Sequence, residues 1–402
     1  MKLRPFSSLR PAPGIASRFT CPPYDVIDRE SVRETIRQNP DSFLRITRSD
    51  GELPDHVDPH SPEVYQLSAR NLRAFLDEGL LLREDGPCLY VYRQKRGNHS
   101  QTGVAGCVSV EDYRDQTIRV HEKTRPEKVR DRSDHMRATG LHAEPVFLAF
   151  RTNERISSLI SEETDSEPLY DLTTEDGVSH TLWRIASPSP FVDAFADLPR
   201  VYIADGHHRA ESAKQCADLL AAVPSAGDFP AVLFPHDELL ILPYNRILRE
   251  LPQPPGELLE TLKDTFDIRP ALSGNPSKAG EFCMFIGESW YLLAPRSPAV
   301  SRSPVEALDV STLSRHILEP VFRIEDERTD RNIDFIGGVH GTAALEEAVR
   351  SGRAGCAFSL YPVTIDQLFT VADADLLMPP KSTWFEPKLR SGLFIHQFSE
   401  TP

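Results

Sequence analysis

The stretch of sequence that decides the fold is VYIADGHHRAESA, residues 201–213. Its first four residues are apolar and predict a buried β-strand. Asp205-Gly206 ends that strand, because glycine permits a tight turn. Apolar side chains with helical spacing follow, from Ala210 to Leu220. We therefore predict a strand, a turn and a helix whose first N–H groups have no partner within the helix.

This junction has the features of an anion site. The N–H groups at the start of a helix attract negative charge, and here the glycine is followed by His207, His208 and Arg209. We expect Gly206 and these three residues to hold a phosphate. Asp205 and His208 are candidate catalytic groups, and Asp205 is a candidate metal ligand. The alternative is a capped helix start, where Asp and Gly are common. Neighbouring histidines diverge by about 100° around a helix, so the pair is a poor metal site.

A second group of polar residues begins at His121 and runs to Arg132. His121 and Thr124 precede a predicted helix and are placed to reach phosphate oxygens. Glu122 is a candidate catalytic group and, with Asp205, a candidate Mg²⁺ ligand. Arg132 is a further candidate for nucleotide binding. The alternative for the following helix is a charged face toward water. The pattern is not the zinc motif H-E-x-x-H, because its fifth residue is arginine.

Two further motifs carry candidate groups. In Cys21–Ile27, two prolines make a stiff, extended loop, and Asp25 could take a proton from a substrate hydroxyl. The alternative is an Asx-turn that starts the next helix. In residues 378–388, Lys381 and Lys388 could clamp an anion or close a lid over it. The alternative there is a surface loop packed by its aromatic residues.

Composition places the chain among ordinary globular proteins. Its 402 residues are 40% hydrophobic and 26% charged, with a net charge of −15. Such a surface repels nucleic acid at long range, so we expect a nucleotide and a small molecule as partners. A homo-oligomer is compatible with these data. The sequence contains no apolar run long enough to span a membrane. It also lacks a secretory signal and C-x-x-C pairs, which predicts a cytoplasmic location.

The order of the predicted elements indicates an α/β (α+β) protein of two units. Residues 1–250 are expected to form a core with inserted segments, and residues 256–402 a second α/β unit that contributes the lysine-bearing loop. Pro-rich residues 251–256 are the linker between them, and residues 48–62 are an exposed loop. Besides the helix after Arg209, helices are predicted over 28–38, 63–79, 257–265, 307–318 and 342–351. Strands are predicted over 89–93, 102–111, 145–150, 182–185, 231–234, 239–242, 355–360 and 369–371, and within 281–294.

Four of these motifs, in this order, resemble those of the domain of unknown function 1015 family. They are Cys21–Ile27, the run from His121 to Thr124, Ala204–Arg209 and Pro379–Thr383. The third motif is also similar to the phosphate-binding box of the ParB/sulfiredoxin superfamily, which implies a nucleotide-binding core of that kind. The archaeal free-serine kinase, a member of that superfamily, is similar in residue type and shares an Asp-Gly-x-His-Arg-like junction.

The resemblance implies a small-molecule kinase. Its nucleotide would be ATP or ADP, or CTP, with Mg²⁺, and its acceptor a small hydroxylated metabolite such as free serine. The junction would grip the nucleotide phosphates, and Asp25 would face the acceptor hydroxyl. Sulfiredoxin chemistry is disfavoured because His207 stands where that enzyme has its cysteine. A ParB role is disfavoured because no basic DNA-binding region follows residue 251.

Two alternative functions stay open at this point. One is a non-catalytic regulator that binds CTP or ATP. The other is a nucleotide or phosphoester hydrolase that uses His121, and His207 or His208, with a metal.

Overall fold

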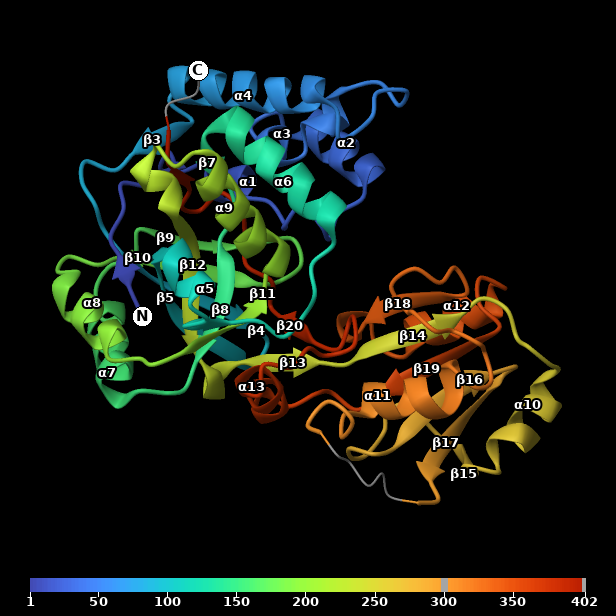
Figure 1. The fold of residues 1–402 in the computed structure, drawn as a ribbon. Coiled ribbons are helices and arrows are strands. Elements are labelled where there is room, and N and C mark those ends of the chain that lie inside the picture. Colours follow the sequence, from blue (N-terminus) through green and yellow to red (C-terminus); the bar gives the residue numbers. More distant parts are fainter. Residues whose placement is uncertain (298–302, 400–402) are drawn as a thin grey trace. The chain divides into compact units, whose positions relative to one another are not determined.

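The chain folds into two compact units in the computed structural model, which describes residues 1–297 and 303–399 (Figure 1). The first unit consists of residues 1–120, 124–239 and 387–399. The second consists of the described part of 240–386 together with 121–123. None of the helices in the described residues combines the length and the apolar character that a membrane span requires.

A mixed sheet of nine strands, counted over the described residues, forms the centre of the first unit. In spatial order its strands are β6 (Ile118–Arg119), β11 (Val201–Asp205), β8 (Val146–Phe150), β12 (Asp228–Pro235), β5 (His99–Ser109), β4 (Tyr90–Arg96), β10 (Ser179–Arg184) and β9 (Tyr170–Thr173), with β1 (Leu3–Arg4) paired to β5. β11 is parallel to β6, and β12 is parallel to β8. The other neighbours are antiparallel.

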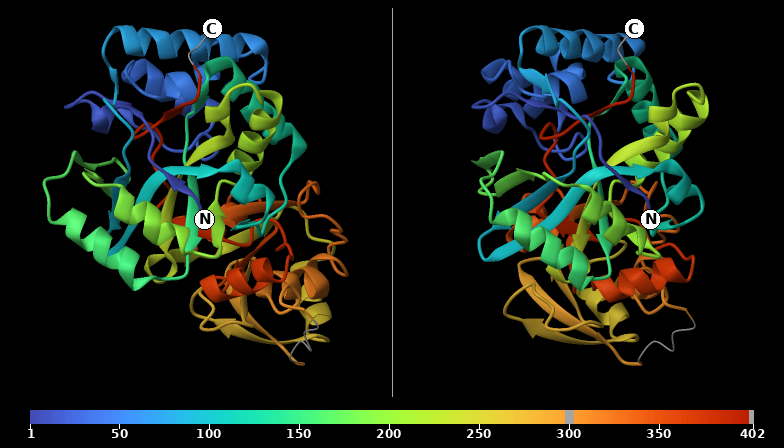
Figure 2. Two further views of the ribbon diagram at one scale, coloured as in Figure 1. Left: turned by 60° about the vertical axis from the view of Figure 1, so that its left-hand side comes forward. Right: turned by 90° about the vertical axis from the view of Figure 1, so that its left-hand side faces the viewer.

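Helices cover this sheet and extend the first unit. They are α1 (Ala16–Phe19), α2 (Arg29–Gln38), α3 (Leu44–Thr47), α4 (Pro62–Asp77), α5 (Val110–Arg114), α6 (Pro126–Thr139), α7 (Glu154–Thr164), α8 (Ser189–Ala196) and α9 (His207–Leu219). Two short strand pairs, β2 (Leu9–Pro11) with β3 (Leu81–Arg83) and β7 (Leu141–His142) with β21 (His396–Gln397), complete it. Both views in Figure 2 show the long helix α4, in blue, at one edge of this unit.

Buried clusters of side chains hold the first unit together, and two of them are large. One lies along the sheet and includes Val104 and Leu148, with Ala210 of α9 packed among them. The other lies among the N-terminal helices and includes Phe75. Ile395 belongs to this second cluster, so the C-terminal segment 387–399 is part of the first unit although the intervening chain is not.

The second unit has a separate, antiparallel sheet. Its strands, in spatial order, are β15 (Phe266–Ala271), β17 (Ser289–Pro295), β16 (Phe282–Ile286), β19 (Cys356–Leu360), β14 (Tyr244–Leu248) and β18 (Ile333–Gly337). Around it lie the helices α10 (Pro255–Leu262), α11 (Asp309–Leu313), α12 (Ala343–Arg350) and α13 (Ile365–Asp373) and the π-helical turn Ser314–Leu318. A short pair joins β13 (Leu240–Leu242) to β20 (Trp384–Glu386).

The predicted mixed α/β class is confirmed, and so are the elements with strong local signals. α2 follows Asp28, whose side chain accepts a hydrogen bond from the backbone N–H of Ser31. The predicted hairpin is formed by β4 and β5. The strand, turn and helix of the opening motif are β11, Gly206 and α9.

Three predictions of the fold need correction. Residues 369–371 are not a strand but part of α13, which a capping box between Thr364 and Gln367 starts. Residues 49–52 form a short 3₁₀-helix with a buried Asp50 rather than an exposed loop. The two units divide at residue 240 rather than near 250, because β14 hydrogen-bonds to β18 and β19 of the second sheet.

Buried histidines make the stability of the first unit depend on pH. Burial lowers the pKa of His135 and of His396 to about 4 and that of His142 well below its usual value. The unfolded chain therefore binds more protons than the folded one below about pH 6.5. Stability present above that pH is lost as the pH falls toward 4. We expect the free energy of unfolding, measured by urea titration, to fall between pH 7.5 and pH 5 by about 1–2 kcal/mol for each buried histidine.

A pair of variants tests this pH dependence. His142 stacks on His396, and their ring centroids are 5.5 Å apart. His142→Phe removes a titrating ring from this buried position and is expected to reduce the pH slope of the unfolding free energy. His56→Asn, at an exposed site, is expected to leave the slope unchanged. Equal slopes in both variants would contradict the prediction.

Candidate functional site

The predicted junction has the geometry expected of an anion site. Gly206 adopts a left-handed backbone conformation with a φ of 98° and stands at the N-cap of α9. It offers no side chain to the first N–H groups of the helix. His207, the first residue of α9, is buried, and His208 is partly buried.

Arg209 lies at the centre of a group of charged residues that we call the junction cluster: Asp25, Glu144, Asp205, Arg209 and Lys388. Its Nη2 lies 3.3 Å from Oδ2 of Asp205 and 3.9 Å from Oδ1 of Asp25. Its Nε lies 3.7 Å from Oε2 of Glu144. The guanidinium also donates a hydrogen bond to the backbone carbonyl of Pro145. Arg209 therefore holds three carboxylates in place at the junction.

Burial and charge act against each other in this cluster. Arg209 is 4% exposed, and burial by itself lowers the pKa of its guanidinium. The carboxylates of Asp205, Glu144 and Asp25 outweigh that effect and raise its pKa. Burial raises the pKa of Glu144, which accepts hydrogen bonds from the backbone N–H of Tyr24 and the hydroxyl of Ser391. The cluster is therefore a compensated ionic core.

Lys388 comes to this cluster from the C-terminal segment. Its Nζ lies 3.6 Å from Oδ1 of Asp205, and its backbone carbonyl accepts a hydrogen bond from Nε2 of Gln94. The two oxygens of Asp205 thus face two different cations, Lys388 and Arg209. This predicted member of the anion clamp does lie at the junction.

Lys381, the other lysine predicted to clamp an anion, belongs to the second unit. Its Nζ lies 5.2 Å from the centre of the Tyr244 ring, and its backbone has a positive φ of 56°. The fully buried Arg246 donates hydrogen bonds to the carbonyls of Pro380 and Lys381. Arg246 thereby fixes the loop that carries Lys381.

His208 ties the second motif to α9. Its Nε2 accepts a hydrogen bond of 3.0 Å from the backbone N–H of Arg125. That nitrogen must be unprotonated, so the proton of the neutral ring is assigned to Nδ1. Thr124, directly before Arg125, is brought to the junction by the same contact.

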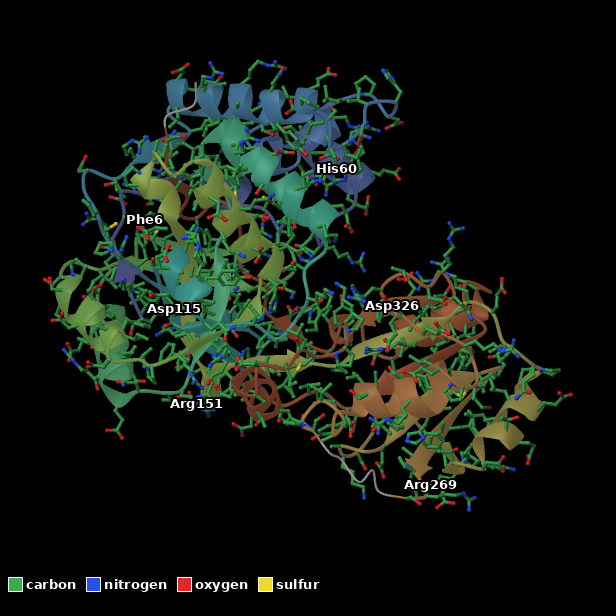
Figure 3. The ribbon with its side chains drawn as sticks, viewed as in Figure 1. Phe6, His60, Asp115, Arg151, Arg269 and Asp326 are labelled. Carbon is green, nitrogen blue, oxygen red and sulfur yellow. The ribbon has the colours of Figure 1, made fainter. Side chains whose placement is uncertain are left out.

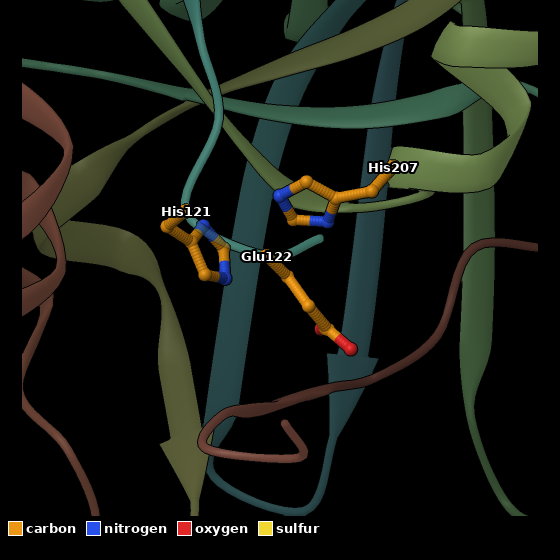
Figure 4. Close-up of side chains that lie close together, drawn as sticks. All are labelled: His121, Glu122 and His207. Atoms are coloured by element: carbon orange, nitrogen blue, oxygen red, sulfur yellow. The ribbon is translucent and has the colours of Figure 1, made fainter. Parts of the chain in front are cut away.

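Residues suited to a metal follow the ends of β6 and β11. These strands are parallel neighbours, so the segments that follow them leave the sheet at the same edge. Figure 4 shows His121 and Glu122 on the segment after β6 and His207 on the first turn of α9. Imidazole and carboxylate are ligands for divalent metals. Glu122 therefore stays a candidate ligand.

A cavity of about 560 Å³, which we call the α6 pocket, opens beside the junction cluster in the first unit. Its size is typical of small-molecule sites. Among the predicted site residues, Asp25 and Arg132 line it. Its remaining lining residues are Tyr24, Ile27, Arg29, Thr47, Arg48, Asp50, Pro59, His60, Val64, Tyr65, Ser68, Glu127, Lys128, Arg130, Asp131, Asp134 and His135.

Sequence reasoning missed most of this pocket. His60, labelled in Figure 3, precedes α4 in a stretch expected to be a solvated loop. Arg48 anchors the Asp25 loop by donating hydrogen bonds to the carbonyls of Tyr24 and Ile27. The signal available in the sequence was the Pro59-His60 pair close to the N-terminus of an amphipathic helix, which alone does not indicate a site.

The fold and the site together define a mixed α/β protein with an ionic junction beside a small-molecule pocket. The chain belongs to the family described as protein of unknown function (DUF1015), whose model matches residues 3–311. That match includes the first three motifs and ends before the fourth. A comparison with curated proteins finds no match.

Several solved structures are similar to this chain. Free serine kinase in complex with AMP is 13% identical, with 72% of this chain and 92% of that chain covered and a TM-score of 0.37. SbnI with a C-terminal truncation, from Staphylococcus aureus, is 12% identical, with 72% and 86% covered and a TM-score of 0.41. A conserved hypothetical protein from Pyrococcus furiosus is 12% identical, with 73% and 95% covered and a TM-score of 0.38. At these scores the likenesses carry no argument about function, which depends on the side chains.

Removing the central arginine tests the junction cluster. Arg209→Met leaves the buried Glu144 without its nearest cation, and we expect a loss of about 3–5 kcal/mol in the free energy of unfolding. The control is Arg137→Met at an exposed ion pair, which is expected to change stability by less than about 0.5 kcal/mol. Urea titrations measure both, and equal midpoints would show that the cluster is not a stabilising core.

Proposed function

We propose that this protein is a nucleotide-dependent phosphotransferase that acts on a small hydroxylated metabolite. The observation that carries this proposal is the position of Asp25. Its carboxylate lies 3.9 Å from Nη2 of Arg209 in the junction cluster, and the same residue lines the α6 pocket. A carboxylate that is 34% exposed thus stands between a helix start suited to phosphate and a cavity suited to a small molecule.

In this proposal the nucleotide binds at the start of α9. It is ATP or ADP, or CTP. The N–H groups that follow Gly206, together with His207, meet the phosphates. Thr124, His121 and Lys388 add hydrogen bonds and charge. Lys381 is the further cation of this scheme, on the loop that Arg246 holds.

Glu122 and Asp205 are the proposed Mg²⁺ ligands. Glu122 suits this role because carboxylate oxygens are ligands that Mg²⁺ prefers. The Nζ of Lys388 lies 3.6 Å from Oδ1 of Asp205. Asp205 can therefore bind the metal only if the metal takes the place of this ammonium group. When bound, the metal would neutralise charge on the phosphates.

The acceptor, for example free serine, binds in the α6 pocket with its hydroxyl at Asp25. The hydroxyl oxygen forms a bond to the γ-phosphorus, and the bond from that phosphorus to the bridging oxygen breaks. The carboxylate of Asp25 takes the hydroxyl proton, and ADP leaves. His208, whose Nε2 is engaged by Arg125, orients the start of α9 against the second motif.

A substrate screen tests the reaction class. Wild-type protein is incubated with ATP, Mg²⁺ and a panel of hydroxylated metabolites, and we expect one acceptor to yield a phosphorylated product in equal amount with ADP. Chelation of Mg²⁺ is expected to stop the reaction. Tight nucleotide binding without any product would instead indicate a regulator. Free phosphate formed without an acceptor would indicate a hydrolase.

Variants at the junction test the assigned residues. Asp25→Asn removes the proton acceptor, and we expect kcat to fall about 100-fold or more while the KM for nucleotide stays near the wild-type value. Asp205→Asn and His208→Ala are expected to abolish turnover while leaving the fold intact, which circular dichroism checks.

The matched control is Asp218→Asn, which removes a carboxylate from the exposed end of the same helix. It is expected to keep full activity. A comparable loss of thermal stability in both Asp205→Asn and His208→Ala would assign the junction a structural role instead.

A further inference from the structure

One carboxylate organises the wall of the α6 pocket. Asp131, on α6, is 7% exposed. Its Oδ1 accepts hydrogen bonds from the hydroxyl of Tyr65 at 2.7 Å and from Nδ1 of His60 at 2.8 Å. Its Oδ2 accepts a hydrogen bond of 2.7 Å from Nε of Arg132. Both oxygens are therefore satisfied, and Asp131 acts as a fixed anchor for three donors.

Two of the side chains that donate to Asp131, Arg132 and His60, each keep a nitrogen that makes no hydrogen bond within the described residues. Nε and Nη2 of Arg132 face Asp131, and its guanidinium carbon lies 4.2 Å from the centre of the Tyr24 ring. Among the described residues, its Nη1 makes no hydrogen bond or ion pair. His60 donates from Nδ1 to Asp131. Its other ring nitrogen, Nε2, makes no hydrogen bond within the described residues.

Two other arginines that line the pocket, Arg29 and Arg48, are committed to the protein. Arg29 donates to the backbone carbonyls of Asp50 and Val57. Arg48 donates to the carbonyls of Tyr24 and Ile27 and pairs with Asp50. Such arginines hold loops and have little left for a ligand. Arg132 is different, because its position is fixed by stacking and by Asp131 while one amino group stays unused.

We infer that the α6 pocket recognises an anionic group of the acceptor, a carboxylate or a phosphate, through Nη1 of Arg132 and through Nε2–H of His60, which the ring offers when both of its nitrogens carry protons. This inference rests on the proposed function and names the chemical class of its acceptor: a hydroxylated small molecule that carries an anion. A fixed guanidinium suits such a group because its N–H donors are charged and already oriented. Asp131 and Tyr24 are positioning residues for this contact.

The recognition residues and Asp25 lie on one continuous wall. Tyr24 stacks on Arg132 and is directly followed by Asp25 in the chain. The anion of the acceptor would thus bind on the Arg132 side of Tyr24, with its hydroxyl toward Asp25. Recognition at a distance from the reacting oxygen predicts an effect on KM rather than on kcat.

Matched acceptor pairs test the inference. Each pair differs in the anionic group: L-serine and ethanolamine, glycerate and ethylene glycol, and glycerol phosphate and glycerol. We expect wild-type protein to phosphorylate the member of each pair that carries the carboxylate or phosphate, and not the member that lacks it. Calorimetry is expected to show the same preference in binding. Glycerate and glycerol phosphate distinguish a carboxylate from a phosphate as the recognised group. A member without the anionic group that is as good as its partner would overturn the inference.

Two variants assign the recognition to the named residues. His60→Asn keeps a donor for Asp131 but lacks Nε2, and Arg132→Lys keeps the charge but loses the planar fork. In each, we expect the KM and the Kd for the anionic acceptor to rise about tenfold or more, with kcat changed far less. His60 is 66% exposed, so its variant stays informative if Arg132→Lys folds poorly. Arg70→Gln removes an exposed positive charge from α4 that is not among the residues lining the pocket and is the control expected to leave both constants unchanged.

The outcomes separate this inference from the proposed function. Anion-dependent binding that is lost in both variants, without phosphate transfer to any acceptor, would overturn the phosphotransferase and leave the anion site intact. Phosphate transfer with unchanged KM and Kd in His60→Asn would overturn the anion site and leave the phosphotransferase intact.

Discussion

The burial of Arg209 is the constraint on which the site in the first unit depends. A charge removed from water must be compensated nearby. The compensating carboxylates come from three separate segments, with Asp25 before α2, Glu144 before β8 and Asp205 at the end of β11. Their ion pairs bring the start of α9 beside a loop that is distant in sequence. The junction and the pocket are neighbours because one guanidinium needs all three partners.

The same physical rule recurs elsewhere in the chain. Arg48 donates to two carbonyls of the loop that carries Asp25, and in the second unit Arg246 pairs with Glu327 and donates to the loop that carries Lys381. These arginines act as scaffolds because the guanidinium has several donors in a fixed plane. Against this background Arg132 stands out, since it is held like the others but keeps an unused amino group.

Features that depend on near neighbours in sequence were predictable. The cap at Asp28, the hairpin of β4 and β5 and the turn at Gly206 follow from local hydrogen bonding and backbone freedom. Local reasoning failed where a short apolar run was ambiguous. Residues 369–371 are helical because the capping box that starts at Thr364 begins a helix before them. Strand pairing likewise moved the division between the units, since β14 joins the second sheet.

The sequence by itself determined which chemical groups the junction carries and the strand, turn and helix that present them, because these depend on spacing and on one glycine. Tertiary structure decided what each group does. It placed Arg209 at the centre of three ion pairs, and it brought Lys388 to Asp205. It also built a pocket wall from His60 and Asp131, residues that no local pattern connects. Compensation of buried charge acts between segments far apart in the chain, so only the folded structure shows which partners meet.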